Sequence, residues 1–188
     1  MSFVVLYDAC VLHPAILRDL LIRIGNSGIV RARWSERILD ECFASILKQR
    51  PDLNQGALAR TRELMCRAVP DCLVSGFEHL ELALDLPDED DRHVLAAAVR
   101  ANAQAIVTFN LRDFPDHVLE RYDIEAKHPD DFVLDSIDIA PAGIARCLTE
   151  QLGTYRSPVL AMSELLDSLR TAGLIRSVAR LRELLQSP

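Results

Sequence analysis

The chain has 188 residues, enough for one domain with a sizeable hydrophobic core. Hydrophobic residues make up 49% of it and charged residues 26%, a globular composition that excludes a disordered chain. The formal net charge of −7 excludes nucleic-acid binding by overall charge alone, so such binding would need local arginine or lysine patches or bound cations.

The first residues, the length of the apolar runs and the cysteines indicate in which cellular compartment the protein is expected. The first residues, MSFVVLYDAC, lack the basic segment of a secretory signal, and no apolar run reaches the roughly 18 residues of a membrane span. The five cysteines are odd in number and show no C-x-x-C spacing, which favours reduced thiols and argues against zinc. We therefore expect a cytoplasmic protein without a membrane segment.

Strand and helix signals alternate in the first part of the chain. They predict a strand at 3–8, a helix at 14–28, a strand at 29–34, a helix at 35–50 and a helix at 55–69. The first strand ends at Asp8, Pro14 opens the first long helix, and Ser35 is a suitable N-cap for the second.

The alternation continues to about residue 129. We predict a strand at 72–76, short helices at 78–84 and 116–122, an alanine-rich helix from about 91 to 101, a strand at 105–109 and an edge strand at 123–129. Short apolar strands that alternate with helices indicate an α/β fold whose parallel sheet is covered on both faces.

The pattern changes near residue 139, after which helices follow one another without a strand. They are predicted at 141–152, 157–173 and 175–186. We therefore divide the chain into a domain at 1–138 and a C-terminal helical extension at 139–188. The last helix is basic and amphipathic, and packing against the domain is favoured over binding a partner.

An acidic cluster stands where a buried helix should begin. In LPDEDDRHVLAAAVRANAQAIVTFNLRDFP, four acidic residues precede the alanine-rich segment. Asp88 is a suitable N-cap, and compensation of the helix dipole contributes about 0.3–1 kcal/mol for each acid. Asp91, however, precedes Val94 and Leu95 by three and four residues, which places it on the stripe facing the core. No arginine or lysine shares that stripe within two turns, so a cation is the expected partner.

Further acids follow other strands of the predicted sheet. Asp8 ends the first strand, and Asn110 and Asp113 lie in the loop after the strand at 105–109. Functional groups of open α/β sheets gather outside the carboxyl ends of the strands, so Asp8, Asp91 and Asp113 are expected at one rim.

A fourth acid is expected on the helix at 35–50, where periodicity does not choose between Asp40 and Glu41. Unpaired carboxylates brought together from different elements repel one another unless a counter-ion is bound. Ligand sets made only of oxygen suit the hard cations Mg²⁺ and Mn²⁺, which can assist phosphodiester hydrolysis. A metal would also explain how an acidic protein approaches a phosphate.

Four segments in this order resemble the PIN domain family: VVLYDACVL, SERILDE, DEDDRHVLAAA and TFNLRDF. Within that family they are similar to the branch that contains the VapC-type ribonuclease toxins of bacterial toxin–antitoxin modules. The resemblance covers roughly residues 3–135, and the last two segments are its specific part. It implies a three-layer α/β/α sandwich with a short parallel sheet, and a ribonuclease that depends on Mg²⁺ or Mn²⁺.

The resemblance also assigns residues. It implies that four acids bind metal and carry catalysis: Asp8, Glu41, Asp91 and Asp113. Asp88 and Asn110 match accessory positions, and Thr108 ends a strand beside them, where strand packing and substrate contact both stay open. The first motif reads DAC where DTN or DTS is frequent. The missing hydroxyl or amide at Cys10 is expected to weaken the orientation of the metal ligands without removing one.

The implied partners are an RNA substrate and an antitoxin of a type II system, and the family often forms homodimers. Two alternatives stay open: a PIN-like binding module without catalysis that acts through its helical extension, and a housekeeping PIN nuclease without an antitoxin. Chemistry through an aspartyl phosphate is disfavoured, because Cys10 stands where such phosphatases carry a second Asp. A receiver-type phospho-acceptor is disfavoured as well, because TFNLRDF offers no lysine.

Four side chains near the motifs have simpler explanations. His93 follows Asp91 by two residues, which predicts that it points away from Asp91, toward solvent or a local hydrogen bond. His13 either faces substrate or serves the helix entry, and Arg112 contacts either phosphate or a nearby acid. Trp34 is expected to pack on the next helix rather than hold RNA bases.

Overall fold

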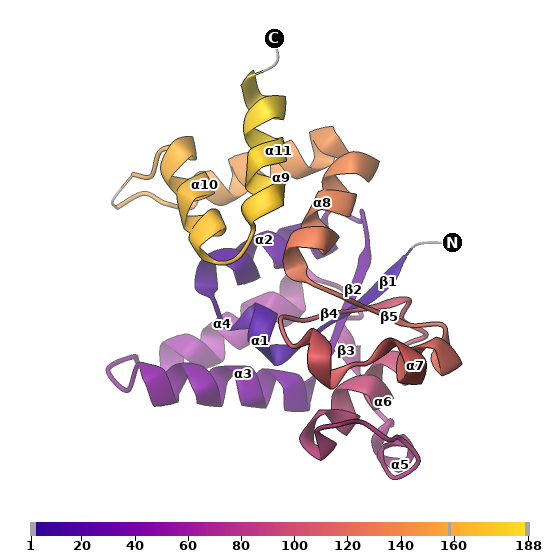
Figure 1. Ribbon diagram of the computed structural model, residues 1–188. Helices are drawn as coiled ribbons and strands as arrows, with labels where there is room; N and C mark the ends of the chain where they lie inside the picture. The colour runs from indigo at the N-terminus through magenta and orange to yellow at the C-terminus, as the bar shows by residue number, and fades with distance from the viewer. Residues whose placement is uncertain (1–2, 158, 187–188) are drawn as a thin grey trace.

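The computed structural model describes residues 3–157 and 159–186. Its centre is a sheet of five parallel strands in the order β3-β2-β1-β4-β5, with helices above and below it (Figure 1). The strands are β1 (Val4–Tyr7), β2 (Arg31–Ser35), β3 (Leu73–Val74), β4 (Ala105–Val107) and β5 (Glu125–Lys127). The predicted α/β/α sandwich is confirmed, and β5 lies at an edge, as the sequence predicted.

Eleven α-helices lie within the described residues. They are α1 (Ala9–Leu12), α2 (Ala15–Asn26), α3 (Glu36–Gln49), α4 (Gln55–Ala68), α5 (Glu78–Glu81), α6 (Arg92–Arg100), α7 (Asp116–Leu119), α8 (Pro129–Ile139), α9 (Pro141–Leu152), α10 (Met162–Thr171) and α11 (Ile175–Gln186). Three single 3₁₀ turns, η1 (Glu89–Asp91), η2 (Leu111–Asp113) and η3 (Glu120–Tyr122), also occur there. None of these helices is long and apolar enough to cross a membrane.

The order of the strands creates a switch point at the centre of the sheet. From β1 the chain builds outward through β2 to β3, and it then returns to place β4 on the other side of β1. The loops that leave β1 and β4 therefore diverge beside each other, and such a crevice is where open α/β sheets place their ligands. Leu6 lies beside Ile106 and Tyr7 beside Val107 in this pair, so Asp8 and Thr108 leave the sheet at the same level.

The helices cover both faces of the sheet with apolar side chains. On one face the ring of Tyr7 stacks on Trp34, with 6.2 Å between centroids, and meets the edge of Phe132 from α8 at 5.8 Å. On the other face α6 contributes a completely buried run that includes Val94 and Leu95. Trp34 is 0% exposed, so it belongs to the core and is not available to stack on RNA bases.

One helix, α8, was not expected. Its sequence PDDFVLDSIDI follows β5 after a single residue, and we had predicted an edge strand up to residue 129 and no helix before 139. Pro129 at the first helical position and two acids in the first turn are the signals that favour a helix start there. The proposed boundary between 1–138 and 139–188 stays a prediction, because α8 contacts both the sheet and α11.

The C-terminal helices are attached to the sheet domain by buried polar contacts. The carboxylate of Asp130 on α8 accepts hydrogen bonds from the backbone N–H groups of Arg176 and Ser177 in the first turn of α11, both at 2.8 Å. On α9, the buried Gln151 donates from Nε2 to the carbonyl of Ile16 on α2 at 2.8 Å. Val178 of α11 is buried, so the basic amphipathic helix packs on the domain, as expected.

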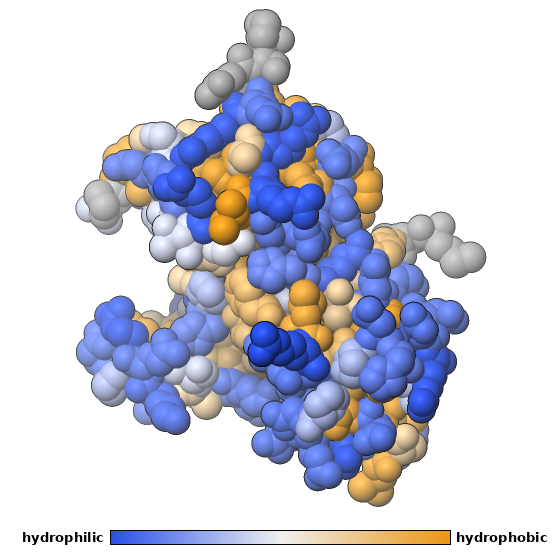
Figure 2. All heavy atoms as spheres, viewed as in Figure 1, coloured by the Kyte–Doolittle hydropathy of each residue, from blue (hydrophilic) through white to orange (hydrophobic). Residues whose placement is uncertain are grey.

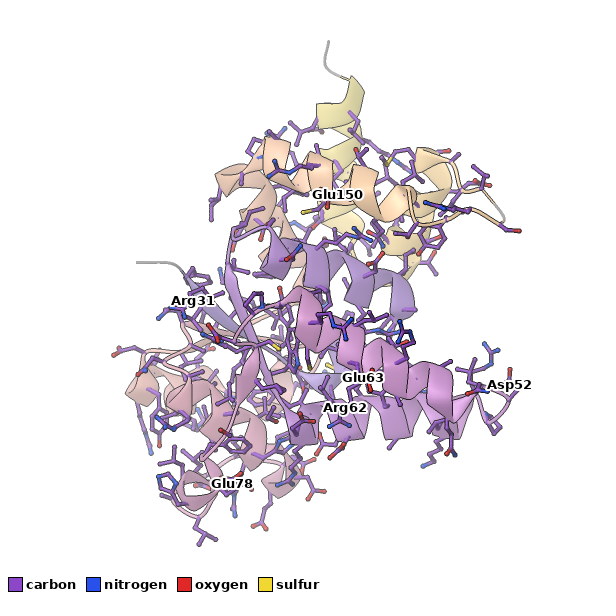
Figure 3. All side chains as sticks on the ribbon, turned by 180° about the vertical axis from the view of Figure 1, so that it is seen from behind. Arg31, Asp52, Arg62, Glu63, Glu78 and Glu150 are labelled. Atoms are coloured by element: carbon purple, nitrogen blue, oxygen red, sulfur yellow. The ribbon has the colours of Figure 1, made fainter. Side chains whose placement is uncertain are left out.

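The surface is mainly charged or polar, with scattered apolar patches on the face shown in Figure 2. From behind, α4 lies beside α3 and presents Arg62 (Figure 3). Arg62 pairs with both Glu36 and Asp40 of α3, which fixes the two helices side by side. Asp40 therefore points toward α4, whereas Glu41 lies on a different side of α3.

Candidate active site

A cavity of about 400 Å³ opens at the switch point of the sheet. Its walls come from α1, α3, the turn before α6 and the loop after β4. The residues that line it are Asp8, Ala9, Cys10, His13, Glu41, Cys42, Ser45, Gln49, Asp91 and Asn110. Three of the four acids expected to act together therefore share one cavity, although they are separated by up to 83 residues in the sequence (91 − 8).

Asp8 is the most deeply buried of the acids, at 4% exposure. Its Oδ1 accepts a hydrogen bond from the N–H of Ala9 at 2.6 Å, which caps α1. Its Oδ2 accepts one from the hydroxyl of Thr108 at 2.7 Å. Thr108 in turn accepts from the N–H of Asn110 at 2.9 Å, so one hydroxyl links the loops that follow β1 and β4. The sequence left open whether Thr108 packs in the strand or contacts substrate. In the structure its hydroxyl donates a hydrogen bond to Asp8.

Cys10 stands at the position where the frequent DTN and DTS motifs carry an amide or hydroxyl side chain. Its Sγ lies 3.1 Å from Oδ2 of Asp8 and accepts a hydrogen bond from the N–H of Phe109 at 3.2 Å. Burial, and then the charge of Asp8, raise the pKa of this thiol to about 12, so it stays protonated and can donate to the carboxylate. The DAC motif therefore retains a polar contact to its aspartate.

Asp91 is the last residue of the turn η1 and occupies the N-cap position of α6. Burial, then the negative charges of Asp8, Asp113 and Asp88, raise its pKa to about 7. Three other carboxylates are therefore close enough to Asp91 to disfavour its ionised form. Asp113, in η2, takes part in this electrostatic cluster, although it does not line the cavity.

Asp88 is exposed and caps η1, accepting a hydrogen bond from the N–H of Asp90 at 2.9 Å. The cap was expected from its position, but it acts on a 3₁₀ turn rather than directly on α6.

Of the two acids of α3 between which periodicity did not choose, Glu41 is the one that the resemblance implies, and it lines the cavity. Glu41 faces the cavity, whereas Asp40 pairs with Arg62 of α4. Its Oε1 lies 3.4 Å from Nε of Arg37 and 2.9 Å from Nε2 of His93. The side chain is therefore held at the rim of the cavity by contacts from two different helices.

The expectation for His93 was wrong in direction. The imidazole is 0% exposed and faces Glu41 instead of solvent. The spacing argument assumed that the side of α6 away from Asp91 faces solvent. Residues 93–98 of α6 are all buried, so a side chain on this helix that points away from Asp91 still does not reach solvent.

Two residues of the cavity, Ser45 and Gln49, were missed by the sequence analysis. They follow Glu41 at intervals of four, the spacing that places side chains on one face of a helix. His13 lines the same cavity, as its substrate-facing alternative required. Arg112 is exposed and forms no ion pair with any residue in 3–157 or 159–186, so a contact to phosphate stays a prediction.

The donors fit a hard cation in their chemistry. The acids contribute only oxygen atoms, which Mg²⁺ and Mn²⁺ prefer, and the raised pKa of Asp91 reports negative charge that a cation would neutralise. In the part of the chain that the structure describes, no three Asp, Glu, His or Cys side chains already converge as a ready-made metal site. The carboxylates share a cavity, and Glu41 is held at its rim by contacts with Arg37 and His93.

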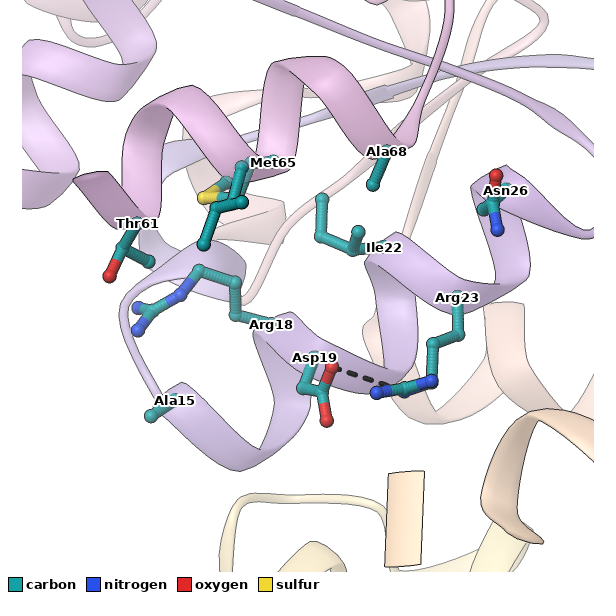
Figure 4. Close-up of a pocket in the computed structure, with 10 residues that line it drawn as sticks. Ala15, Arg18, Asp19, Ile22, Arg23, Asn26, Thr61, Met65 and Ala68 are labelled. Carbon is teal, nitrogen blue, oxygen red and sulfur yellow. Dashed lines mark hydrogen bonds and ion pairs between the residues drawn. The ribbon is translucent and has the colours of Figure 1, made fainter. Parts of the chain in front are cut away.

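A second cavity, of about 320 Å³, lies between α2 and α4 (Figure 4). The acid on its wall, Asp19, pairs with Arg23 at 3.1 Å, so this cavity lacks the clustered carboxylates of the first. Arg18, also on its wall, donates to the carbonyl oxygens of Leu12 and His13 at 2.7 and 3.2 Å. Arg18 therefore stabilises the C-terminal end of α1, and the lining of this second cavity contains no cluster of carboxylates.

The sequence matches two family models. Residues 4–112, more than half of the chain, match a model described as "PIN domain", and residues 129–183 match one described as "VapC50 C-terminal domain". The second match begins at α8, the helix that packs with α9 and α11.

One curated protein is also similar. The chain is 47% identical over 79 residues to "Putative ribonuclease VapC50" of Mycobacterium tuberculosis (strain ATCC 25618 / H37Rv). The match covers 42% of this chain and 47% of that protein, so it spans about half the length of the relative. No solved structure matches the chain.

Proposed function

We propose that this chain, which belongs to the PIN domain family, is a metal-dependent endoribonuclease that hydrolyses the phosphodiester bonds of RNA. The observation that supports this most is the cavity at the switch point, whose lining includes Asp8, Glu41 and Asp91. Burial and the neighbouring acids raise the pKa of Asp91, which adds that several carboxylates lie close enough to repel one another. The name of the curated relative includes the word ribonuclease, which agrees with the proposal.

The acids would share the work of holding Mg²⁺ or Mn²⁺: Asp8, Glu41, Asp91 and Asp113. A bound cation of this kind supplies Lewis acidity toward a phosphoryl oxygen and lowers the pKa of water. Thr108 keeps the carboxylate of Asp8 in one orientation, and Asn110 places its amide on the wall of the cavity. Asp88 adds negative charge at the entrance.

The proposed activity is tested by incubating the purified chain with single-stranded RNA and Mn²⁺ or Mg²⁺, with EDTA as the control. We expect degradation that requires the metal and that EDTA stops. Cleavage that continues in EDTA would contradict a role of the metal. If metal-loaded protein leaves RNA intact, the non-catalytic binding module becomes the better account.

We further propose that the chain acts as the toxin of a type II toxin–antitoxin system, with an antitoxin protein as partner. The match of residues 129–183 to a VapC50 C-terminal domain supports this role. The reading frame next to its gene provides the test: a small DNA-binding protein encoded there is expected. A neighbourhood without such a frame would favour a housekeeping nuclease.

Removing the hydroxyl of Thr108 should impair the site without unfolding the protein. Thr108→Val keeps the shape of the side chain but deletes the hydrogen bond to Oδ2 of Asp8. Loss of a group that orients a metal ligand typically costs about 10–100-fold in metal affinity or activity, and we expect that range for the rate of RNA degradation. Thr149→Val, on the exposed face of α9, is the matched control and should retain the full rate. Equal rates for Thr108→Val and the unmodified chain would refute the orienting role.

The affinity for Mn²⁺ should depend on pH. Because the pKa of Asp91 is raised to about 7 in the metal-free protein, a proton competes with the cation for this carboxylate at lower pH. The affinity is therefore expected to fall by up to about tenfold per unit below pH 7 and to level off above it. Isothermal titration with Mn²⁺ between pH 5.5 and 8 measures this, and a flat profile would show that Asp91 does not contact the cation.

A further inference from the structure

His93 is a buried polar side chain without an evident role in the fold. Its ring is 0% exposed, among apolar residues of α6 that are equally buried. Neither ring nitrogen has a hydrogen-bond partner among the described residues. Burying an imidazole without partners costs free energy that an apolar side chain of similar size would avoid. A residue that only filled space here would be better replaced by leucine.

A close polar neighbour of the imidazole is Glu41. Nε2 of His93 lies 2.9 Å from Oε1 of Glu41, although the ring N–H does not point along that line. His93 also lies near enough to Asp91 to influence the pKa of that carboxyl, as the smallest of several influences, so the ring lies near both carboxylates. It therefore lies close to two acids that come from different elements of the fold.

The other neighbour of Glu41 holds it less firmly. Arg37 approaches Oε1 at 3.4 Å, but its side chain is 45% exposed and is shared with Glu81 of α5 at 3.0 Å. Surface ion pairs of this kind hold a side chain weakly, because both partners retain alternative conformations in water. The imidazole, by contrast, is enclosed on all sides and cannot move away. Of the two contacts, the one to His93 is therefore the better constraint on Glu41.

We propose that His93 is a positioning residue that holds Glu41 at the rim of the acidic cavity, so that the carboxylate is ready to bind a divalent cation. The inference rests on the proposed function, because it concerns a ligand of the proposed metal. Both contacts to Glu41 fall on Oε1, so Oε2 is the oxygen expected to reach the cation. Groups that orient metal-binding carboxylates in this way raise metal affinity by limiting the conformations of the ligand.

Three substitutions of His93 separate positioning from packing. His93→Leu removes the donor, His93→Gln places an amide nitrogen near the position of Nε2, and His93→Asn places one near Nδ1, away from Glu41. Isothermal titration with Mn²⁺ should show affinity reduced by about 10–100-fold for His93→Leu and His93→Asn, and largely retained by His93→Gln. Arg37→Gln, which removes the weaker contact to Glu41, should change the affinity by less than about threefold.

The stability of the metal-free variants provides a second readout. Because the 2.9 Å contact of the imidazole with Glu41 lacks hydrogen-bond geometry, the melting temperature of His93→Leu without metal should equal or exceed that of the unmodified chain. Weaker Mn²⁺ binding in a protein of undiminished stability is not expected from a residue that merely fills the core. If His93→Leu does not fold, the comparison of His93→Gln with His93→Asn still decides, because both are polar and differ in where the amide lies.

A double substitution identifies Glu41 as the route of the effect. In a Glu41→Gln background, His93→Leu should change the Mn²⁺ affinity no further, because the ligand that it positions is already lost. The same loss in both backgrounds, or unchanged affinity in His93→Leu alone, would overturn the inference. These outcomes leave the proposed function intact as long as the unmodified chain binds Mn²⁺ and degrades RNA. If the unmodified chain does neither, the proposed function fails, and the inference about His93 fails with it.

Discussion

Replacing Asp91 with asparagine is expected to stop RNA degradation and, at the same time, to make the metal-free protein more stable. The amide keeps the size of the side chain but cannot supply the negative charge that a divalent cation requires. We therefore expect the rate of degradation in Mn²⁺ to fall by at least about 100-fold. Among the site substitutions, this is the largest expected effect on activity.

The gain in stability follows from the sign of the pKa shift. The pKa of Asp91 is raised in the folded protein, so the ionised form is disfavoured there by burial and by the neighbouring acids. The folded state binds more protons than the unfolded state between about pH 4 and pH 7, so this group lowers stability as the pH rises through that window. The amide of the Asp91→Asn variant carries no charge, so the substitution should raise the free energy of unfolding at pH 8 by about 1 kcal/mol, after discounting for solvent screening.

Asp90→Asn is the matched control for this experiment. Asp90 is exposed and belongs to the same acidic run, but it neither lines the cavity nor raises the pKa of Asp91. Its substitution should leave the rate and the urea unfolding curve essentially unchanged. An Asp91→Asn protein that still degrades RNA at the normal rate would remove Asp91 from the site.

Substitution of Asp130 by alanine should cause the largest loss of stability among these predictions. Asp130 is 6% exposed, and its two oxygens accept hydrogen bonds from the first turn of α11, where the helix dipole also favours a negative charge. Asp130→Ala leaves two backbone N–H groups without their acceptor. We expect the free energy of unfolding in urea to fall by about 2–4 kcal/mol.

This stabilisation should also depend on pH. The hydrogen bonds from Arg176 and Ser177 outweigh the opposing effect of burial, so the pKa of Asp130 is lowered in the folded protein. Its contribution is therefore complete above the pKa of an unfolded aspartate, near pH 4, and is lost as the pH falls through the lower folded value. The difference in stability between the unmodified chain and Asp130→Ala should shrink accordingly below pH 4.

The neighbouring acid provides the control for Asp130. Asp131 pairs with the guanidinium of Arg176 at 2.6 Å, but both side chains are at least half exposed. Asp131→Ala should therefore cost no more than about 0.5–1 kcal/mol. If both alanine variants lose the same small amount, the buried cap at α11 does not hold the C-terminal helices as we describe.

The elements that sequence reasoning could predict are those whose signals are local. The apolar run of β1, the Ser35 cap of α3 and the periodicity of α2 each fix an element without knowledge of the rest of the fold. α8 carried equally local signals at Pro129, but they directly follow β5, and we assigned those residues to the edge strand. α8 was therefore missed because it begins directly after β5, and not because its helix signals are weak.

The site was predictable only in part, because its members are positioned by contacts between distant segments. Residues that follow the strands, such as Asp8, could be placed at one rim from the parallel order alone. The choice of Glu41 over Asp40 depends on α4, whose Arg62 engages Asp40 from the opposite side. The buried position of His93 depends on the segments packed around α6, which bury every residue from 93 to 98. The metal-binding role of these residues stays a prediction.

The most direct test is a crystal structure of the protein grown with Mn²⁺, in which anomalous scattering locates the ion. Our account predicts an anomalous peak in the cavity between β1 and β4, coordinated by oxygens of Asp8 and Asp91 and joined by Glu41 or Asp113. A peak elsewhere on the surface, or none at Mn²⁺ concentrations that support RNA degradation, would contradict it.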